Sequence, residues 1–254
     1  MFTGLKFSED GTVCRLNDFP ARHFFTTMRA GNMSLKWDDE KTAQENFARC
    51  FSAHGNVLAE IVSILPEHSD NIVVLPHYYD GETEKICDGL MTSSCDTYLV
   101  LRPADCFPIL MGTIDRKFVG LIHAGWRGTD LEIARLAVKL AVRTYRVEAE
   151  DIFIGIGPGI HKCCWDHLAD ELPADPRWKP FVGEGLLGKY VDLLDFNVKQ
   201  LLDAGIKHEH IKIAAHCACC AKDKNDEYLF FSHHRAERIT GEKEGRFATV
   251  ISMI

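Results

Sequence analysis

Short apolar runs bounded by turn residues recur along the chain, and they constrain its fold more than any other feature of the sequence. Each run is four or five residues long, which is typical of a buried β-strand. The runs lie at Ile72–Leu75, Tyr98–Leu101, Phe107–Met111, Phe118–Ile122, Ile152–Ile156, Ile211–Ala215, Tyr228–Phe231 and Phe247–Ile251. The polar stretch Lys222–Glu227 predicts a hairpin tip or loop ahead of one of them.

Helical periodicity is confined to three segments, Glu40–Phe51, Asp130–Tyr145 and Val191–Ala204. Thr129 or Asp130 would cap the second helix, and Gly205 suits the position after the third. Helices and strands do not alternate strictly, which disfavours a doubly wound parallel sheet and favours an α+β fold. With neither an internal repeat nor a Pro/Gly-rich linker, residues 1–254 are predicted to form a single domain.

Charge and composition exclude several classes of protein. The chain has 37 acidic and 29 basic residues, giving a net charge of -8, so neither nucleic acid nor an anionic membrane is an expected partner. We see no targeting segment and no apolar run that would span a bilayer, which predicts a cytoplasmic protein. In that compartment the 10 cysteines would stay reduced, as buried apolar residues, ligands or nucleophiles.

The main candidate residues for chemistry come together between Arg102 and Gly128. Cys106 lies between two apolar runs, His123 directly follows another, and His77 comes shortly after the run Ile72–Leu75. Two imidazoles and a thiolate suit zinc, and also copper. Three protein ligands would leave a fourth position for water, as in catalytic zinc sites. We therefore predict a metal held by His77, Cys106 and His123.

Two other interpretations of these residues stay open. The spacing between them matches no zinc-finger pattern, and a buried cysteine beside two hydrogen-bonded histidines is the plainer alternative. Cys106 could instead be a nucleophile that His123 activates without a metal.

Residues around these ligands are further candidates. Arg127 could bind phosphate through two hydrogen bonds, helped by the start of the following helix, or could form a structural ion pair. Asp105 could orient a ligand or serve as a turn residue. Trp126 is predicted to pack rather than to stack on a base.

The C-terminal half holds more residues of this kind. Ser232 has no base placed near it by sequence, and at most one of His233 and His234 could face a site if both lie on a strand. Five cysteines invite a second, structural zinc, but their spacing is not the usual pair of Cys-x-x-Cys motifs, so incidental thiols are favoured. They are Cys163, Cys164, Cys217, Cys219 and Cys220.

Two motifs carry a resemblance to a known family. The segment Ala104–Pro108, followed by His123–Gly128, resembles the YfiH/laccase-domain family, also called the multicopper polyphenol oxidoreductase or purine nucleoside phosphorylase family. The resemblance extends from about residue 71 to the C-terminus. Its further elements are Cys87–Thr92, Ile156–Ile160 with Cys163-Cys164, Phe230–Ser232 and Gly245–Ala248.

The resemblance implies a mixed, mostly antiparallel β sandwich with flanking helices, similar to the catalytic domain of the cytotoxic necrotising factor toxins. It implies metal ligands at His77, Cys106 and His123. The activity would be phosphorolysis of adenosine, inosine, guanosine or methylthioadenosine, with deamination of adenosine. Small-molecule substrates (a purine nucleoside and phosphate) are the expected partners, and we expect a monomer or a small homo-oligomer.

Other functions remain as alternatives. The family name suggests a copper-dependent, laccase-like polyphenol oxidase, although three candidate ligands are too few for a multicopper centre. A Cys–His amidase acting on a cell-wall precursor would use Cys106 as its nucleophile. A non-enzymatic binding module would leave the open metal position without a purpose.

Overall fold

Two large β-sheets dominate the structure, a computed structural model that describes residues 1–34, 36–37, 39–55, 59–77, 79, 81–167, 172–185 and 188–253. The first sheet has the order β1 (Phe2–Thr3), β16 (Ile211–Ala214), β12 (Ile152–Ile156), β10 (Phe107–Thr113), β11 (Val119–Ala124), β8 (Gly89–Thr92) and β6 (Ile72–Val74). The second has the order β2 (Leu5–Phe7), β3 (Val13–Leu16), β4 (Arg22–Thr26), β17 (Thr249–Ser252), β9 (Thr97–Leu101), β5 (Glu60–Leu65) and β7 (Glu84–Ile86). A small third sheet holds β13 (Asp166–His167), β15 (Lys189–Val191) and β14 (Val182–Glu184).

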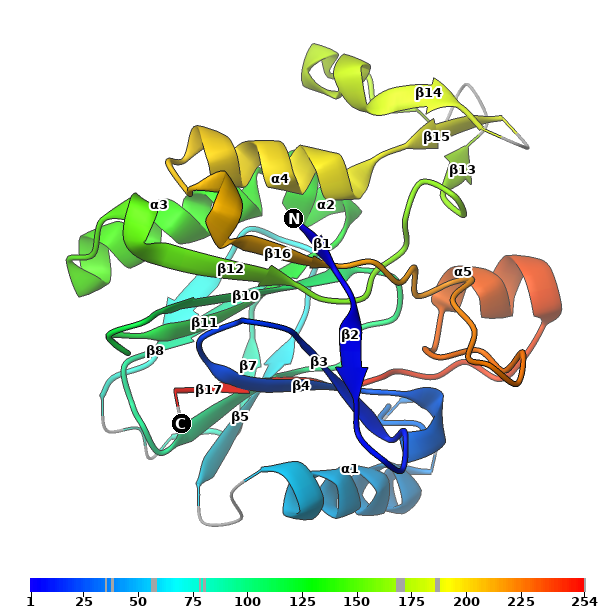
Figure 1. Ribbon diagram of the computed structural model, residues 1–254, viewed down its shortest axis with the longest axis horizontal. Helices are drawn as coiled ribbons and strands as arrows, with labels where there is room; N and C mark the ends of the chain where they lie inside the picture. Colours follow the sequence, from blue (N-terminus) through cyan, green and yellow to red (C-terminus); the bar gives the residue numbers. More distant parts are fainter. Residues whose placement is uncertain are drawn as a thin grey trace.

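The two large sheets pack face to face between layers of helix (Figure 1). On the outer face of the first sheet lie α2 (Trp126–Asp130), α3 (Ile133–Tyr145) and α4 (Leu193–Asp203). On the outer face of the second sheet lies α1 (Glu40–His54), and the short α5 (His233–Arg235) lies to one side. Most strand pairs are antiparallel, although β6 with β8 and β12 with β16 are parallel. The predicted α+β sandwich with flanking helices is confirmed.

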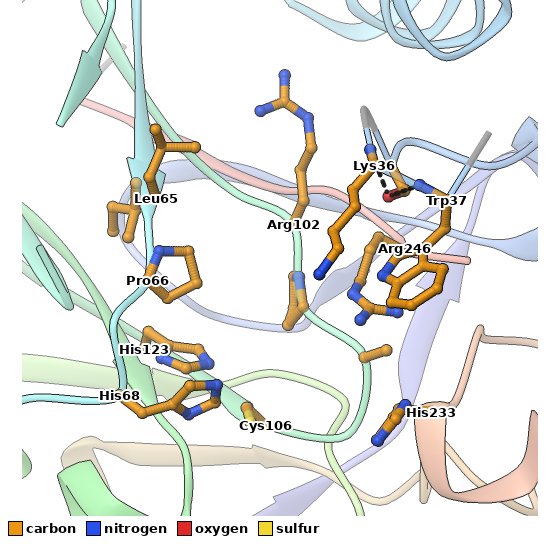
Figure 2. A pocket seen from close by; sticks show the side chains of 14 residues that line it. Lys36, Trp37, Leu65, Pro66, His68, Arg102, Cys106, His123, His233 and Arg246 are labelled. Carbon is orange, nitrogen blue, oxygen red and sulfur yellow. Dashed lines mark hydrogen bonds between the residues drawn. The ribbon is translucent and has the colours of Figure 1, made fainter. Parts of the chain in front are cut away.

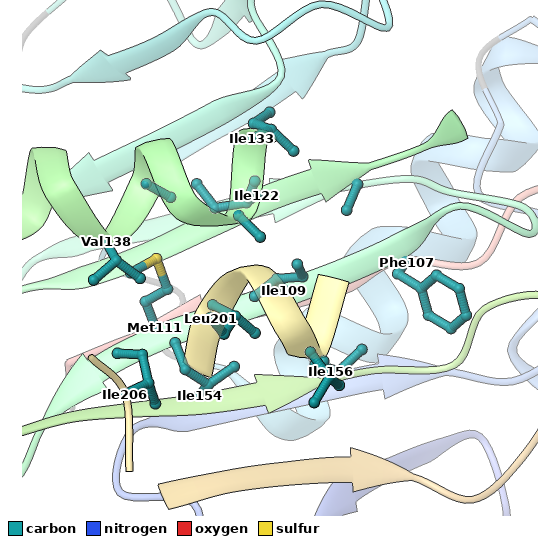
Figure 3. Close-up of a cluster of buried hydrophobic side chains, with 14 of the residues drawn as sticks. Phe107, Ile109, Met111, Ile122, Ile133, Val138, Ile154, Ile156, Leu201 and Ile206 are labelled. Carbon is teal, nitrogen blue, oxygen red and sulfur yellow. The ribbon is translucent and has the colours of Figure 1, made fainter. Parts of the chain in front are cut away.

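The first sheet is buried on both faces, which explains its unbroken apolar runs. Figure 3 shows one face, where strand residues such as Ile109 and Ile154 meet Ile133 and Val138 of α3 and Leu201 of α4. The opposite face packs against the second sheet through a separate apolar cluster. Every residue of β10 and β11 is buried as a result. The packed pair therefore holds the residues at its ends in fixed positions. Among the described residues, no helix combines the length and apolar character needed to cross a membrane.

Two predicted elements, and the strand considered for His233 and His234, differ from the structure. The helix expected over Asp130–Tyr145 is two helices, because Glu132 adopts a left-handed conformation (φ 61°) between α2 and α3. The run Tyr228–Phe231 is not a strand: it forms one isolated bridge, and the carbonyl of Phe230 accepts a hydrogen bond from the Arg235 guanidinium instead of a neighbouring strand. His233 and His234 lie in α5, not on a strand.

The other predicted elements are confirmed to within a few residues. α1 begins after Asp39, whose carboxylate accepts a hydrogen bond from the Thr42 amide at 2.9 Å. α4 ends at Asp203, and Gly205 takes the left-handed conformation (φ 99°) expected after a helix. The polar stretch Lys222–Glu227 forms the predicted turn, closed by the bridge between Lys222 and Tyr228.

Candidate metal centre

The β10–β11 hairpin brings Cys106 and His123 together. Cys106 directly precedes β10, and His123 is the second-last residue of β11. At this end of the hairpin Pro108 pairs with His123 and Phe107 pairs with Ala124. Their side chains therefore emerge at the same edge of the first sheet. His123 is 2% exposed, so its imidazole is held inside the protein with only one end available to a ligand.

His68 is the third member of this group. The ligand-competent atoms of His68, Cys106 and His123 all lie within 4.8 Å of one another. The rings of His68 and His123 are 4.9 Å apart between centroids and inclined at 68°. Figure 2 shows the three side chains gathered at one side of a cavity. We call this group the His–Cys–His cluster.

The predicted ligand His77 lies elsewhere, and its assignment is corrected to His68. His77 is exposed, with Nδ1 3.3 Å from the Ser93 hydroxyl. The cause is the direction of β6, which runs parallel to β8 and starts at the edge where β11 ends. His123 is four residues from the start of β11, a separation of roughly 13 Å at ~3.4 Å per residue. β6 ends near the start of β11, and His77 lies beyond that point. The loop before β6, not the segment after it, reaches the cluster.

Asp88 fixes both histidines and was not singled out as a site residue by the sequence. Its buried carboxylate accepts a hydrogen bond from Nδ1 of His123 at 2.8 Å. It also accepts hydrogen bonds from the amides of Glu67 (3.2 Å), His68 (3.0 Å) and Ser69 (2.7 Å) and from the Ser69 hydroxyl (2.7 Å). With Nδ1 of His123 bound in this way, Nε2 is the nitrogen left to face Cys106, an arrangement typical of metal-binding histidines.

The charges around the cluster favour a cation. Burial is the largest influence on His123 and lowers its pKa, but Cys106 and Asp88 outweigh burial and raise the pKa to about 9. Burial acts to raise the pKa of Asp88, yet hydrogen bonds from His123 and Ser69 lower it to about 2. Burial, followed by the charge of His123, lowers the pKa of His68. The field that attracts a proton to His123 also attracts a metal ion, which would bind by displacing that proton.

Gly125 leaves the room that a metal would need. A Cβ atom at this position would come within 2.9 Å of both the Cys106 sulfur and Nδ1 of His68 and within 3.3 Å of the His123 ring. Three donors of zinc-binding type thus surround a space that a methyl group would fill. Atoms bound to one zinc ion lie about 3.3–3.8 Å apart in a tetrahedral site, so small side-chain rotations would bring the cluster into that range. The residues present fit a single metal ion.

Gly125→Ala should therefore weaken metal binding by about 10-fold or more, since overpacking of this kind costs ~1–3 kcal/mol. The backbone would tolerate alanine, because Gly125 has φ -80°. Isothermal titration with zinc measures the effect. Gly112→Ala in β10 is the matched control: its Cβ would meet its neighbours at 3.6 Å or more, so binding should be unchanged. Equal affinities for the two variants would contradict this reading of the Gly125 space.

Two cavities meet at the His–Cys–His cluster, and His68, Cys106 and His233 line both of them. The larger, about 490 Å³, is bounded by Leu65 and Pro66 on one side and by Lys36, Trp37 and Arg246 on the other (Figure 2). The smaller, about 320 Å³, has as further walls Trp126, Trp165, Ile160, Leu193, Asp105 and Arg127. Cavities of this size suit small molecules.

Arg127 lies in α2 at the wall of the smaller cavity and is exposed. Among the described residues, no carboxylate lies within ion-pair distance of its guanidinium. The structural ion pair considered as an alternative role for Arg127 is therefore not formed with any of these residues. Its positive charge contributes to lowering the pKa of His68. Arg127 was predicted to lie before the helix, whereas it lies in the first turn of α2.

The remaining candidates have structural contacts. Asp105 takes a left-handed conformation (φ 78°), and one carboxylate oxygen accepts a hydrogen bond from the His234 amide at 2.7 Å. Its other oxygen is buried without a hydrogen-bond partner among the described residues. Trp126 packs on Trp178, with ring centroids 4.7 Å apart. Ser232 caps α5 by accepting a hydrogen bond from the Arg235 amide at 3.1 Å.

Known proteins match this chain over most of its length. The family model for multi-copper polyphenol oxidoreductase laccase matches residues 22–254. A curated relative from Geobacillus stearothermophilus, "Purine nucleoside phosphorylase YlmD", is 39% identical over 160 residues, which are 61% of this chain and 57% of the relative. The chain thus matches just over half the length of that relative, and of its Bacillus subtilis counterpart, of which 56% is covered.

Solved structures extend the match to nearly the whole chain. The Bacillus licheniformis hypothetical protein YfiH superposes with a TM-score of 0.80 at 26% identity, covering 98% of this chain and 99% of its own. YlmD from Geobacillus stearothermophilus gives a TM-score of 0.78 at 28% identity, covering 97% of each chain. With the family model matching far more than half of the sequence, this chain belongs to the multi-copper polyphenol oxidoreductase laccase family.

Proposed function

We propose that this chain catalyses metal-dependent phosphorolysis of purine nucleosides at His68, Cys106 and His123. The observation that carries the proposal is the His–Cys–His cluster, which borders two cavities and so has access to two reactants. Relatives that match the chain are named purine nucleoside phosphorylases. Zinc is the proposed metal, because its preferred donors are the nitrogen and sulfur atoms found here; copper is the alternative.

The larger cavity is the proposed nucleoside site. Its volume of about 490 Å³ suits a molecule of this size, and Trp37 faces Leu65 and Pro66 across it, so a planar base would lie between apolar surfaces. Of the two cations at this wall, the Arg246 guanidinium donates to the Glu244 carboxylate at 2.7 Å, and the Lys36 ammonium lies 4.9 Å from the centre of the Trp37 ring. The apolar surfaces on both sides are the reason for assigning the nucleoside, not the free phosphate, to this cavity.

The smaller cavity is the proposed phosphate site. Arg127 has a guanidinium without a described carboxylate partner, close enough to His68 for its charge to be felt there. Guanidinium binds phosphate through two parallel hydrogen bonds. Phosphate held there would lie beside Cys106 and His68, the two ligands that also line the proposed nucleoside site, so the two reactants would meet at the metal.

Phosphorolysis joins a phosphate oxygen to C1′ of the ribose and breaks the bond between C1′ and N9. The bonding electron pair stays on the purine, which takes up a proton. Arg127 would hold the attacking phosphate and Trp37 the departing base, so the protein contributes mainly position and charge. A zinc ion held by the cluster would supply Lewis acidity to an oxygen of the bound reactants.

The assay for the proposal is incubation of purified protein with adenosine, inosine, guanosine or methylthioadenosine, with and without phosphate. Free base and ribose 1-phosphate should form only when phosphate is present, and a strong chelator should stop their formation. Absence of phosphate-dependent base release from all four nucleosides would reject the proposal.

Deamination of adenosine is a second candidate, favoured by the chemistry of the donors. Histidine and cysteine ligands with an open position are also those of zinc deaminases that attack a purine or pyrimidine ring with activated water. Inosine formed from adenosine without phosphate would reveal this activity. A multicopper oxidase finds less support: among the described residues, donor groups gather only as the His–Cys–His cluster and a group of four cysteines, whereas that chemistry needs many histidines.

Arg127→Ala should raise the KM for phosphate by about 10- to 100-fold, because hydrogen bonds to charged groups contribute ~1.5–3 kcal/mol. The KM for the nucleoside should change little. Trp37→Ala should do the reverse, raising the KM for the nucleoside and sparing phosphate. Steady-state kinetics with each reactant varied in turn separates the two. An unchanged phosphate KM in Arg127→Ala would exclude Arg127 from the phosphate site.

A further inference from the structure

Four cysteine side chains converge in a second place, away from the His–Cys–His cluster. Cys163 and Cys164 lie in the turn that follows β12, and Cys217 and Cys220 lie in the turn that follows β16. These strands are parallel neighbours, so the segments leaving them run side by side. A bridge between Gly159 and Cys217 continues the pairing beyond the sheet. The sulfurs of all four cysteines lie within 4.8 Å of one another.

The distances between sulfurs are those of a tetrahedral metal site. Cys163 is 3.8 Å from Cys164 and 3.7 Å from Cys220, sulfur to sulfur. Four sulfurs each ~2.3 Å from one zinc ion would be about 3.8 Å apart. A disulfide would need ~2.0 Å, and all four cysteines are free thiols. Clusters with several irons would spread the ligands over different metal atoms, whereas these sulfurs surround one point.

The surrounding backbone supports negatively charged sulfur. The His161 amide donates to the Cys217 sulfur at 3.3 Å, and the nearby amides of Cys219 and Cys220 also favour the thiolate form of Cys217. Hydrogen bonds of this kind orient metal-binding thiolates and compensate part of their charge. Cys217 and Cys220 have the two-residue spacing of structural zinc ligands, a pattern that the intervening Cys219 obscures in the sequence. The Cys219 side chain interacts with Cys164 and Ser232, but its sulfur is not among the four that lie within 4.8 Å of one another.

We propose that Cys163, Cys164, Cys217 and Cys220 bind a second zinc ion with a structural role. Four cysteine ligands fill the tetrahedral coordination of zinc and leave no position for a substrate, which distinguishes this site from the His–Cys–His cluster. The interpretation favoured by the sequence, incidental thiols, did not anticipate that the two turns meet.

The second ion would hold one wall of the smaller cavity. Cys164 follows closely on Ile160, which lines that cavity and whose amide donates to the Asp105 carbonyl at 2.7 Å, next to Cys106. Trp165, another lining residue, directly follows Cys164. Linking the two turns through zinc would fix this wall relative to the β10–β11 hairpin, so loss of the ion should loosen the cavity and lower the thermal stability of the whole chain.

The test is metal analysis of the full-length chain purified in a reducing buffer without added metal. In a Cys106→Ala background, which removes a ligand of the other site, zinc should remain at one ion per chain, and adding Cys220→Ser should remove it. Cys95→Ser in the same background is the matched control, because Cys95 is also an exposed thiol and lies outside the group; it should keep the zinc. Full zinc content in the Cys220→Ser variant would overturn the proposal.

A second measurement needs no variant at these cysteines. Titrating the Cys106→Ala protein with a mercurial that binds thiols should release one zinc ion as four thiols react, and replacement of zinc by cobalt should give the intense thiolate-to-cobalt absorption of a four-sulfur site. A protein free of zinc, or a disulfide found by mass spectrometry between any two of the four cysteines as purified, would reject the site.

Discussion

His68→Ala should abolish metal binding at the His–Cys–His cluster and lower kcat/KM for phosphorolysis by at least about 100-fold, while His77→Ala should change neither. The lower bound follows because loss of a residue that only orients a metal ligand lowers metal affinity or activity by ~10–100-fold. Loss of the ligand itself should lower them further. His68 is within 4.8 Å of the other two donors, whereas His77 lies outside the group, with Nδ1 3.3 Å from the Ser93 hydroxyl. The two variants thus test which end of β6 reaches the metal.

Zinc content is the first measurement, because it does not depend on the substrate being correct. Both variants should be made with Cys220→Ser as well, so that zinc at the proposed four-cysteine site does not mask the loss. Zinc retained by His68→Ala and lost from His77→Ala would reverse the assignment. Cys106→Ser adds a separate distinction: activity lost with zinc retained would favour the cysteine nucleophile of the amidase alternative over a metal ligand.

Sequence patterns predicted the parts of the site that depend on neighbouring strands. Cys106 and His123 flank a β10–β11 hairpin whose two apolar runs are visible in the sequence, and antiparallel pairing of consecutive strands is the common outcome. Their proximity therefore follows from local information. The apolar character of both runs is typical of buried strands, and every residue of the two strands is buried.

The parts that were missed depend on the direction of strands that are not joined by a hairpin. β6 is parallel to β8, and nothing in the apolar run Ile72–Leu75 indicates the direction of the strand. Antiparallel pairing would have put His77 at the edge where His123 lies, whereas parallel pairing put His68 there. The four-cysteine group has the same cause, since it forms only because β12 and β16 are parallel neighbours.

One available signal could have located the missed residues. Asp88 directly precedes β8 and is charged, yet it lies between Cys87 and Gly89 in a segment that is otherwise free of charge and fully buried. A carboxylate in such a position needs several donors, and loop amides ahead of a neighbouring strand are the natural source. The loop containing His68 supplies them.

Asp88→Ala should have the largest effect on stability of any single change at the site, lowering the free energy of unfolding by about 3–5 kcal/mol. The carboxylate is fully buried and accepts five hydrogen bonds, from His123 and from the loop Glu67–Ser69. Alanine would leave Nδ1 of the buried His123 without its partner and would remove the acceptor shared by the loop amides. Urea denaturation of the zinc-free protein measures the loss, and Ser69→Ala, which removes only one of the five donors, should cost ~1 kcal/mol.

Asp88→Asn separates the effect on the metal from the effect on the fold. The amide keeps the size of the carboxylate but presents an NH₂ group to one set of donors. If that group faces Nδ1 of His123, the imidazole must accept there and carry its proton on Nε2, the nitrogen that would otherwise bind the metal. Zinc affinity should fall by about 10–100-fold even where the variant remains folded. An Asp88→Asn protein with the zinc affinity and unfolding midpoint of the parent chain would show that Asp88 sets neither the tautomer of His123 nor the position of the His68 loop.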